Sequence, residues 1–412
     1  MGGESYYYLS SAQQERPYHP LTLLLRFIPE PVAYLIPPLL SLGIILLFYP
    51  LVRKINLSEE KVFFMILFYI LTPTYIFTFL TLSSYSLFLL LTLLGINLLL
   101  LETKKKYLAL LPFLLASLID TFSGLVLLAG LTGYFFFIKK SKEHFQNVML
   151  LSIAAMILLN LFLFKATFFL GPFTVQNKAT DLISDLGSFS GVGVFAILLA
   201  IVGFIASWQK KNIIILLSAL AVFTTAYFFN THTAFFFSLF IVILAAAGFA
   251  ILLEQNWKLL ILRNAVLLLL LLGLSFSAVA YLDRLSEYPP TSIDQKSLEW
   301  VRSNTDEEAV VLSMPENSHY ISYFAKRKPV FALHQDYREN YQLSKDIFTA
   351  FYINKLFPLL EKNKVSIIYV SKEMKQTLPQ EQEFLFLLQN ERFKMLYSNE
   401  DAEIWSFEET KQ

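Results

Sequence analysis

Residues 107–138 read YLALLPFLLASLIDTFSGLVLLAGLTGYFFFI, and this stretch decides how the chain is threaded through a membrane. It is 32 residues long and apolar except near its centre, where Asp120 precedes Thr121. About 20 residues suffice to cross a hydrocarbon core about 30 Å thick, whereas a single helix of this length would extend roughly 48 Å. We therefore interpret the stretch as two short membrane helices that turn at Asp120 to Gly124.

The distribution of basic residues supports this turn. If the chain turns at Asp120 to Gly124, the loops on one side of the membrane contain 13 Lys and Arg residues and the loops on the other side contain four. A single span would instead scatter the lysines over both faces. Because an excess of Lys and Arg marks cytoplasmic loops, we expect the N-terminus, the loop 165–191 and the C-terminal domain to lie outside the cytoplasm.

Eight further apolar runs are long enough, or nearly so, to cross a bilayer. They cover residues 32–52, 62–81, 85–101, 148–164, 192–208, 212–229, 234–253 and 264–282. Together with the two short helices they predict a polytopic α-helical membrane protein with about ten membrane helices. We expect it in the cell membrane as a multi-pass protein.

The composition agrees with this fold class and excludes others. Hydrophobic residues make up 56% of the 412 residues and charged residues only 16%, which is not typical of a soluble protein. A net charge of +1 without a basic stripe argues against a nucleic-acid partner. The chain has no Cys, which excludes disulfides, thiol catalysis and Cys-ligated metals.

The charges also divide the chain into parts. Residues 1–282 hold 17 basic and 11 acidic residues, whereas the shorter stretch 283–412 holds 16 basic and 21 acidic residues. We therefore expect an extracytoplasmic N-terminal segment at 1–31, a transmembrane helical domain at 32–282 and a soluble extracytoplasmic domain at 283–412.

The periodicity of the last part predicts a small α/β domain. Ser292 with Gln295 is typical of a capping box ahead of the first helix. The expected helices cover 293–303, 319–325 and 343–362, and the expected strands cover 309–312, 329–332, 365–370 and a hairpin of 393–397 with 403–407. No Gly-rich phosphate loop precedes these helices, so we do not expect a nucleotide site there.

This architecture resembles the GT-C glycosyltransferase superfamily, in its oligosaccharyltransferase-like and polyprenyl-phosphate-sugar branches. Three kinds of stretch carry the resemblance. GESYYYL at 3–9 is similar to the acidic and aromatic start of the first external loop, and LTPTYI at 71–76 to the turn before the second. SLEWVR at 297–302, AVVLS at 309–313 and VSIIYV at 365–370 are similar to the tail domain.

The sequence also departs from the superfamily. The second acidic motif is absent, because Thr81 to Ser84 include no carboxylate, and no Trp-Trp-Asp signature occurs in the tail. The superfamily has a helix ahead of its acidic loop, whereas residues 1–31 contain neither an apolar segment nor a signal peptide. Two explanations stay open: the first span carries a short tail across the membrane, or an upstream helix is missing from the chain.

The resemblance implies a carboxylate that deprotonates the acceptor or holds a metal against the departing phosphate. Glu4 is the leading candidate for both roles, with Mg²⁺ or Mn²⁺ as the metal, and its alternative is an ordinary charge on a frayed terminus. Asp120 is the second catalytic candidate, because an acid within a hydrophobic stretch indicates a functional site. Its alternative role is to cap the second short helix with Thr121 and Ser123.

Five residues are candidates for substrate binding. Tyr6 and Tyr7 could stack on a sugar, although tyrosines at a bilayer boundary are equally typical of an interfacial belt. Arg16 and Arg26 could bind the carrier's diphosphate, or could face solvent and lipid headgroups. His232 lies at an external turn where the superfamily often has a basic residue, but a lone His is weak evidence for a metal.

The implied function is transfer of a sugar from a polyprenyl-phosphate-linked donor to an acceptor on the outer face of the membrane. The expected partners are the lipid-linked sugar donor and membrane lipid. The absent second motif favours an alternative, a degenerate and non-catalytic membrane scaffold that binds glycan or protein. A transporter is a weaker alternative, because only Asp120 supplies a polar break and no internal repeat is visible.

Overall fold

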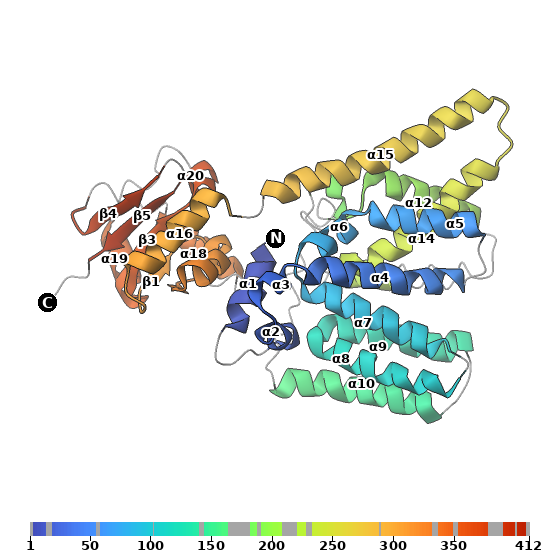
Figure 1. Cartoon of the computed structure of the whole chain (residues 1–412), viewed down its shortest axis with the longest axis horizontal. Coiled ribbons are helices and arrows are strands. Elements are labelled where there is room, and N and C mark those ends of the chain that lie inside the picture. The colour runs from blue at the N-terminus through green and yellow to red at the C-terminus, as the bar shows by residue number, and fades with distance from the viewer. Residues whose placement is uncertain are drawn as a thin grey trace. The chain divides into compact units, whose positions relative to one another are not determined.

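The computed structural model contains two compact units (Figure 1). The globular unit joins Met1–Arg16 to Glu287–Gln412, and the helical unit comprises Pro17–Ser286. The structure describes residues 3–13, 19–54, 58–101, 103–139, 144–163, 182–187, 191–207, 221–227, 233–287, 290–331, 337–348, 353–377, 390–399 and 402–408.

The first half of the helical unit contains the expected break at Asp120. Its elements are α2 (Pro20–Arg26), α3 (Glu30–Ala33), α4 (Ile36–Arg53), α5 (Glu59–Ile70), α6 (Pro73–Leu80), α7 (Ser84–Leu99), η1 (Lys104–Ala109), α8 (Leu110–Ile119) and α9 (Thr121–Gly133). Because α8 ends at Ile119 and α9 begins at Thr121, the predicted turn between two short helices is confirmed.

The second half of the helical unit ends in its longest helix. Its elements are η2 (Tyr134–Lys139), α10 (His144–Leu163), η3 (Ser184–Leu186), α12 (Val194–Ser207), α14 (Ala234–Glu254) and α15 (Leu260–Glu287). Of the expected span at 212–229, residues 221–227 are helical and the rest lies outside the described residues. Contacts join α7 to α8, α8 to α9 and α9 to α10, which Figure 1 shows as neighbouring helices.

The expected span at 62–81 is divided into two helices, because α5 and α6 form a pair bent by 60°. Pro73 is the first residue of α6, and proline cannot donate the backbone hydrogen bond that would continue α5. The side chain of Thr72 accepts a hydrogen bond from the Tyr75 amide at 3.3 Å, and its hydroxyl donates to the Tyr69 carbonyl at 2.6 Å. Thr72 therefore serves both helix ends at the bend.

Four helices of the described residues are long and apolar enough to cross a membrane, and the bent pair makes a fifth. They are Glu30–Arg53, Phe145–Phe162, Phe235–Glu254 and Leu260–Leu285, with Glu59–Ile70 and Pro73–Leu80 as the pair. Shorter apolar helices cover Ser84–Leu99, Thr121–Phe136 and Val194–Ala206. The total of ten membrane helices and their sidedness stay predictions.

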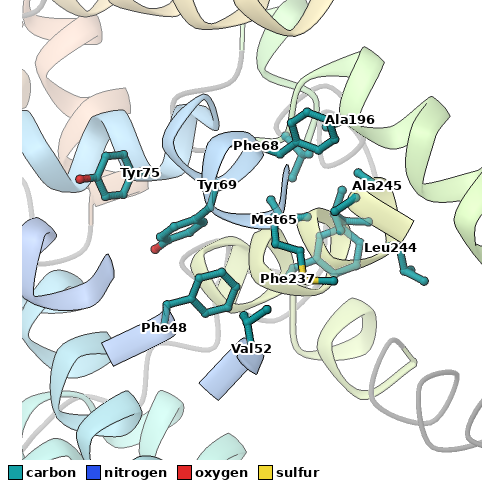
Figure 2. Close-up of a cluster of buried hydrophobic side chains, with 14 of the residues drawn as sticks. Phe48, Val52, Met65, Phe68, Tyr69, Tyr75, Ala196, Phe237, Leu244 and Ala245 are labelled. Carbon is teal, nitrogen blue, oxygen red and sulfur yellow. The ribbon is translucent and has the colours of Figure 1, made fainter. Parts of the chain in front are cut away.

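The core of the helical unit is a cluster of large buried side chains, part of which is drawn in Figure 2. The rings of Phe48 and Tyr69 lie 5.3 Å apart, and those of Phe68 and Phe249 lie 5.4 Å apart, edge to face. Elsewhere apolar side chains face outward; Leu46 is 73% exposed and Phe162 is 78% exposed. A core on the inside and apolar residues on the outside suit a bundle whose solvent is lipid.

Helices α12 and α14 approach each other closely because glycines lie at their contact. A Cβ atom at Gly203 would lie 2.0 Å from the Leu244 carbonyl oxygen. A Cβ atom at Gly248 would lie 2.1 Å from the Leu199 carbonyl oxygen. Small residues at such contacts let helix backbones pack directly in membranes, where burial of apolar surface does not drive helices together.

The globular unit contains a five-stranded mixed sheet of strand order β2-β1-β3-β5-β4. The strands are β1 (Val310–Leu312), β2 (Lys328–Pro329), β3 (Val365–Val370), β4 (Phe393–Ser398) and β5 (Glu403–Phe407). Strand β1 is parallel to β2 and β3, and the hairpin of β4 and β5 adds to β3 in antiparallel fashion. The predicted α/β domain is confirmed.

The helices of the globular unit differ from the prediction in their details. They are α16 (Ser292–Asn304), η5 (Pro315–Asn317), α17 (Ser318–Tyr320), η6 (Ile321–Ala325), α18 (Tyr337–Phe348), α19 (Ile353–Lys362) and α20 (Lys372–Thr377). The capping box uses Thr291 and Asp294, so the expected pair of Ser292 and Gln295 is wrong by one residue. The expected helix 343–362 is two helices instead of one.

The N-terminal helix α1 (Gly3–Ala12) packs within the globular unit, against α17 and η6. The Tyr6 ring lies 5.6 Å from the Tyr320 ring and 5.1 Å from those of Tyr323 and Phe324. Aromatic side chains bury a large area and pack edge to face at such distances. Ring contacts therefore join the N-terminal helix to the C-terminal part of the sequence within the globular unit.

Candidate functional site

Asp120 lies at the break between α8 and α9, where it is the N-cap of α9. Its backbone is extended, with φ −141° and ψ 119°, and a side-chain oxygen accepts a hydrogen bond from the Ser123 amide at 2.8 Å. The first amides of a helix have no partner within the helix, and a carboxylate there also interacts favourably with the helix dipole. The capping role is therefore present in the structure, and the catalytic role stays a prediction.

The carbonyl groups at the end of α8 are bound by two side chains from other elements. His19 Nε2 lies 3.1 Å from the Ile119 carbonyl oxygen. Asn160 of α10 donates through Nδ2 to the Leu118 carbonyl at 3.1 Å and to the Thr121 hydroxyl at 3.2 Å. Unsatisfied backbone groups cost several kcal/mol in a bilayer, so these side chains allow the helix to break there.

The hydrogen bonds of His19 determine its tautomer. Nδ1 accepts from the Leu21 amide at 3.1 Å, so the ring proton is on Nε2 and is donated to Ile119. Burial lowers the pKa of His19 to about 4, although the bond to Ile119 opposes this shift. His19 is therefore neutral near pH 7. We did not identify it from the sequence, although a His directly before Pro20 is a recognisable helix start.

A second polar site lies in the globular unit, at the carboxyl ends of β1 and β3. The chain leaves these neighbouring parallel strands in opposite directions, toward β2 and toward β4, and ligands of open α/β sheets bind at such switch points. Asn317 donates through Nδ2 to Ser313 Oγ at 3.0 Å and to Ser371 Oγ at 3.3 Å. All three side chains are buried.

Carboxylates and tyrosines surround this polar site. Tyr369 donates its hydroxyl hydrogen to Asp294 at 2.7 Å. Partial burial raises the pKa of Glu373, and the nearby carboxylates of Glu316 and Asp294 raise it further. Burial also raises the pKa of Tyr320, as do Tyr6, Glu373 and Asp294. A carboxyl group whose pKa is raised in this way holds its proton up to a higher pH than a solvated carboxyl group does.

Helix α1 brings the predicted tyrosines to this part of the globular unit. Tyr6 is buried against aromatic rings, and the Tyr7 ring lies 5.0 Å from the His319 ring. Glu4 lies in the first turn of the same helix, and its side chain is outside the described part of the chain. The packing accounts for Tyr6 without a sugar, and the proposed roles of Glu4, Tyr6 and Tyr7 stay predictions.

Of the other three predicted binding residues, the structure describes only Arg26. Arg26 is in the last turn of α2 and is exposed, next to Phe27, which is 84% exposed. This surface suits the headgroup region of a membrane. Arg16 and His232 lie outside the described residues. Within the described ranges, no three His, Asp or Glu side chains converge on a point that could hold a metal ion.

Comparison with known proteins finds similarity at the level of structure alone. The sequence matches no protein-family model and no curated protein. A solved structure of the archaeal oligosaccharyltransferase AglB from Archaeoglobus fulgidus, with an inhibitory peptide and a dolichol-phosphate, superposes with a TM-score of 0.62. It is 13% identical, over 91% of this chain and 66% of that one. The chain has an AglB-like fold.

Two further structures of the A. fulgidus oligosaccharyltransferase support the same fold. One is tethered to an acceptor peptide containing the NVT sequon, with a TM-score of 0.60, 14% identity and coverage of 91% of this chain and 65% of that chain. The other is a complex with Zn and sulfate, with a TM-score of 0.58, 14% identity and coverage of 98% and 69%. This chain thus spans 65% to 69% of the length of these AglB chains.

The AglB-like fold agrees with the architecture that the resemblance implied, a helical membrane part followed by an α/β domain. With several apolar helices and this fold, the chain is a multi-pass membrane protein. At 13% to 14% sequence identity, the similarity to AglB establishes the fold alone. Residue roles and substrates must therefore be argued from this chain itself.

Proposed function

We propose that this protein is a membrane glycosyltransferase that uses a polyprenyl-phosphate-linked sugar donor on the outer face of the membrane. The observation that carries the proposal is the AglB-like fold, which extends over 91% of the chain and includes both the helical and the globular unit. A neighbour with this fold contains a dolichol-phosphate, which is the donor chemistry expected here.

Glu4 is the residue we propose as the general base. It belongs to α1, which packs beside the polar site at the ends of β1 and β3. An acceptor held at that polar site would be within the same unit as the carboxylate. Proton removal by a positioned carboxylate typically contributes about 10² to 10⁴ in rate.

Whether the protein could hold the expected Mg²⁺ or Mn²⁺ ion is judged from the side chains that the structure describes. Mg²⁺ prefers octahedral oxygen ligands and usually binds one or two carboxylates. The described residues contain no group of three His, Asp or Glu side chains that could hold a metal, and Glu4 alone would be a single ligand. The described residues therefore do not fit a complete Mg²⁺ or Mn²⁺ site, and no step of the proposed reaction depends on one.

The first test is Glu4→Gln, with sugar transfer measured in proteoliposomes that contain a polyprenyl-phosphate-linked donor. The substitution retains size and hydrogen bonding but removes the charge, so we expect turnover to fall by about 10² to 10⁴. Glu307→Gln is the matched control, because Glu307 is an exposed carboxylate in a turn of the same unit. Equal turnover by wild type and Glu4→Gln would remove Glu4 from the mechanism.

A second function is favoured by the packing of α1. Tyr6 is 6% exposed and its ring contacts three rings of the protein, which leaves little of it for a sugar. A non-catalytic membrane protein whose globular unit binds glycan or protein would show this packing and no turnover. Lack of transfer by wild type with every donor tested would support this second function over the first.

A further inference from the structure

Helix α2, with Phe27 directly after it, has apolar side chains on two opposite faces. One face is buried and consists of Leu21, Thr22 and Leu25. The other face is exposed and consists of Leu23, Leu24 and Phe27. Each exposed residue follows its buried counterpart by two positions, which is about 200° around a helix. A helix that faced water would have polar side chains on its outer face, so the outer face of α2 does not suit water.

The buried face of α2 is fixed to the protein. Helix α2 contacts α8, and its N-cap His19 donates through Nε2 to the Ile119 carbonyl at 3.1 Å, at the end of α8. Thr22 donates its hydroxyl hydrogen to the His19 carbonyl at 2.6 Å. The outer face of α2 therefore cannot turn inward unless these contacts break.

The outer face of α2 continues along the chain into the lipid-facing side of α4. Exposed apolar side chains follow α4 at intervals of four and three residues and so form one stripe, which consists of Leu35, Leu39, Leu42, Leu46 and Tyr49. The other side of the same helix is buried, with Ile44, Phe48 and Val52. Val32 and Tyr34 are exposed as well, so exposed apolar residues lead from α2 to this stripe.

The length of α4 places α2 at the membrane surface. Its 18 residues extend about 27 Å, which is close to the roughly 30 Å of the hydrocarbon core. Arg53, whose side chain is exposed, ends the helix at one boundary of the bilayer. Helices α2 and α3 lie at the other end of α4 (Figure 1), and hence at the opposite boundary. Arg26, Glu30 and Tyr34 are exposed there, as is typical of the headgroup region.

We infer that α2 lies in the surface of the bilayer, with Leu23, Leu24 and Phe27 inserted among the lipid chains. The bilayer is the partner of this face because the lipid-facing stripe of α4 leads to it. Helices of this kind bury their apolar side about 5 to 10 Å into the boundary between headgroups and acyl chains. Since His19 joins α2 to the end of α8, the break at Asp120 lies near the membrane surface and not at the bilayer midplane.

The test uses a fluorescent label on a single Cys of the full chain in lipid nanodiscs. The chain has no Cys, so Phe27→Cys is labelled at one position only. Three quenchers report the surroundings of the label: iodide in the water, and phosphatidylcholine with a spin label either near the headgroup or at the end of an acyl chain. We expect the shallow spin label to quench most strongly, and iodide to quench several-fold less than at a site in water.

Three further variants provide the reference values. Leu46→Cys lies in the middle of α4 on its exposed side, so its label should respond most to the deep spin label. Glu307→Cys lies in an exposed turn of the globular unit, so its label should respond most to iodide. Leu24→Cys is a second position on the outer face of α2 and should behave as Phe27→Cys does.

The other outcomes at positions 24 and 27 would each overturn the inference. Strong quenching by iodide, with none by either lipid, would show that the outer face of α2 lies in water. Protection from all three quenchers would show that protein covers this face, whether a second copy of the chain or another protein. Stronger quenching by the deep than by the shallow spin label would place α2, and with it the break at Asp120, inside the hydrocarbon core.

Discussion

His19 shows how a single side chain fixes the backbone around the break in the helical unit. Its two ring nitrogens join the start of α2 to the end of α8, because one accepts from Leu21 and the other donates to Ile119. Asp120 and Asn160 satisfy further groups at this break. These hydrogen bonds satisfy several of the polar groups that the break between α8 and α9 exposes, which stabilises the irregular backbone there.

A pH dependence follows from the environment of His19. Burial lowers its pKa to about 4, from about 6.5 in the unfolded chain. Between these values the unfolded state binds more protons, so stability rises with pH there. The contribution of neutral His19, at most about 3 kcal/mol, is complete above pH 6.5 and is lost as the pH falls toward 4.

The measurement compares wild type with His19→Asn, which retains a side-chain acceptor for the Leu21 amide but does not titrate. We expect wild type to be the more stable protein at pH 7.5, and the difference in unfolding temperature to shrink at pH 5. Because other groups titrate equally in both proteins, only the difference is informative. The same difference at both pH values would show that His19 does not titrate in this window.

At the scale of elements, the contact between α12 and α14 depends on two glycines. Gly248→Ala would place a Cβ atom 2.1 Å from the Leu199 carbonyl oxygen, so the two backbones must separate. We expect a loss of about 1 to 3 kcal/mol, as for other overpacked contacts, and a lower unfolding temperature. Gly130→Ala in α9 is the matched control, because nothing lies within 4 Å of its Cβ position.

The control should behave in the opposite way. Alanine is preferred to glycine within a helix by roughly 0.5 to 1 kcal/mol, so Gly130→Ala should be neutral or stabilising. If Gly248→Ala unfolds at the same temperature as Gly130→Ala, then α12 and α14 do not pack through their backbones.

The elements that the sequence predicts correctly are those specified locally. The break at Asp120 follows from length and charge, and β3 and the hairpin follow from short apolar runs between turn residues. The bend at Thr72 lies in the stretch 71–76 that the resemblance likened to a turn, whereas the apolar pattern of 62–81 does not show it. The split of 343–362 was missed for a similar reason, since both helices are amphipathic.

The parts of the candidate site that could not be predicted depend on residues far apart in the sequence. Tyr6 was recognised as unusual, but its packing against Tyr320 and Tyr323 joins the two ends of the chain. A single sequence contains no information about such pairs except what local patterns imply.

At the scale of the whole molecule, the packing of α1 constrains the membrane topology. Because α1 contacts α17 and η6 within one compact unit, both ends of the chain must lie in the same compartment. The chain between them must then cross the membrane an even number of times. Ten crossings satisfy this condition, whereas counting 107–138 as a single span gives nine, which does not.

The chain offers a direct test, because it contains no Cys and a single introduced Cys is therefore the only thiol. Gln13→Cys and Gln376→Cys lie at exposed positions of the globular unit, and Lys105→Cys lies at an exposed position of the first turn of η1. We expect an impermeant thiol reagent to label the first two variants in intact cells and to leave Lys105→Cys unlabelled, because the basic loops face the cytoplasm. Labelling of only one of the two globular-unit variants would contradict the packing of α1. Labelling of Lys105→Cys with protection of the other two would keep that packing but reverse the orientation, placing the globular unit away from a donor presented on the outer face.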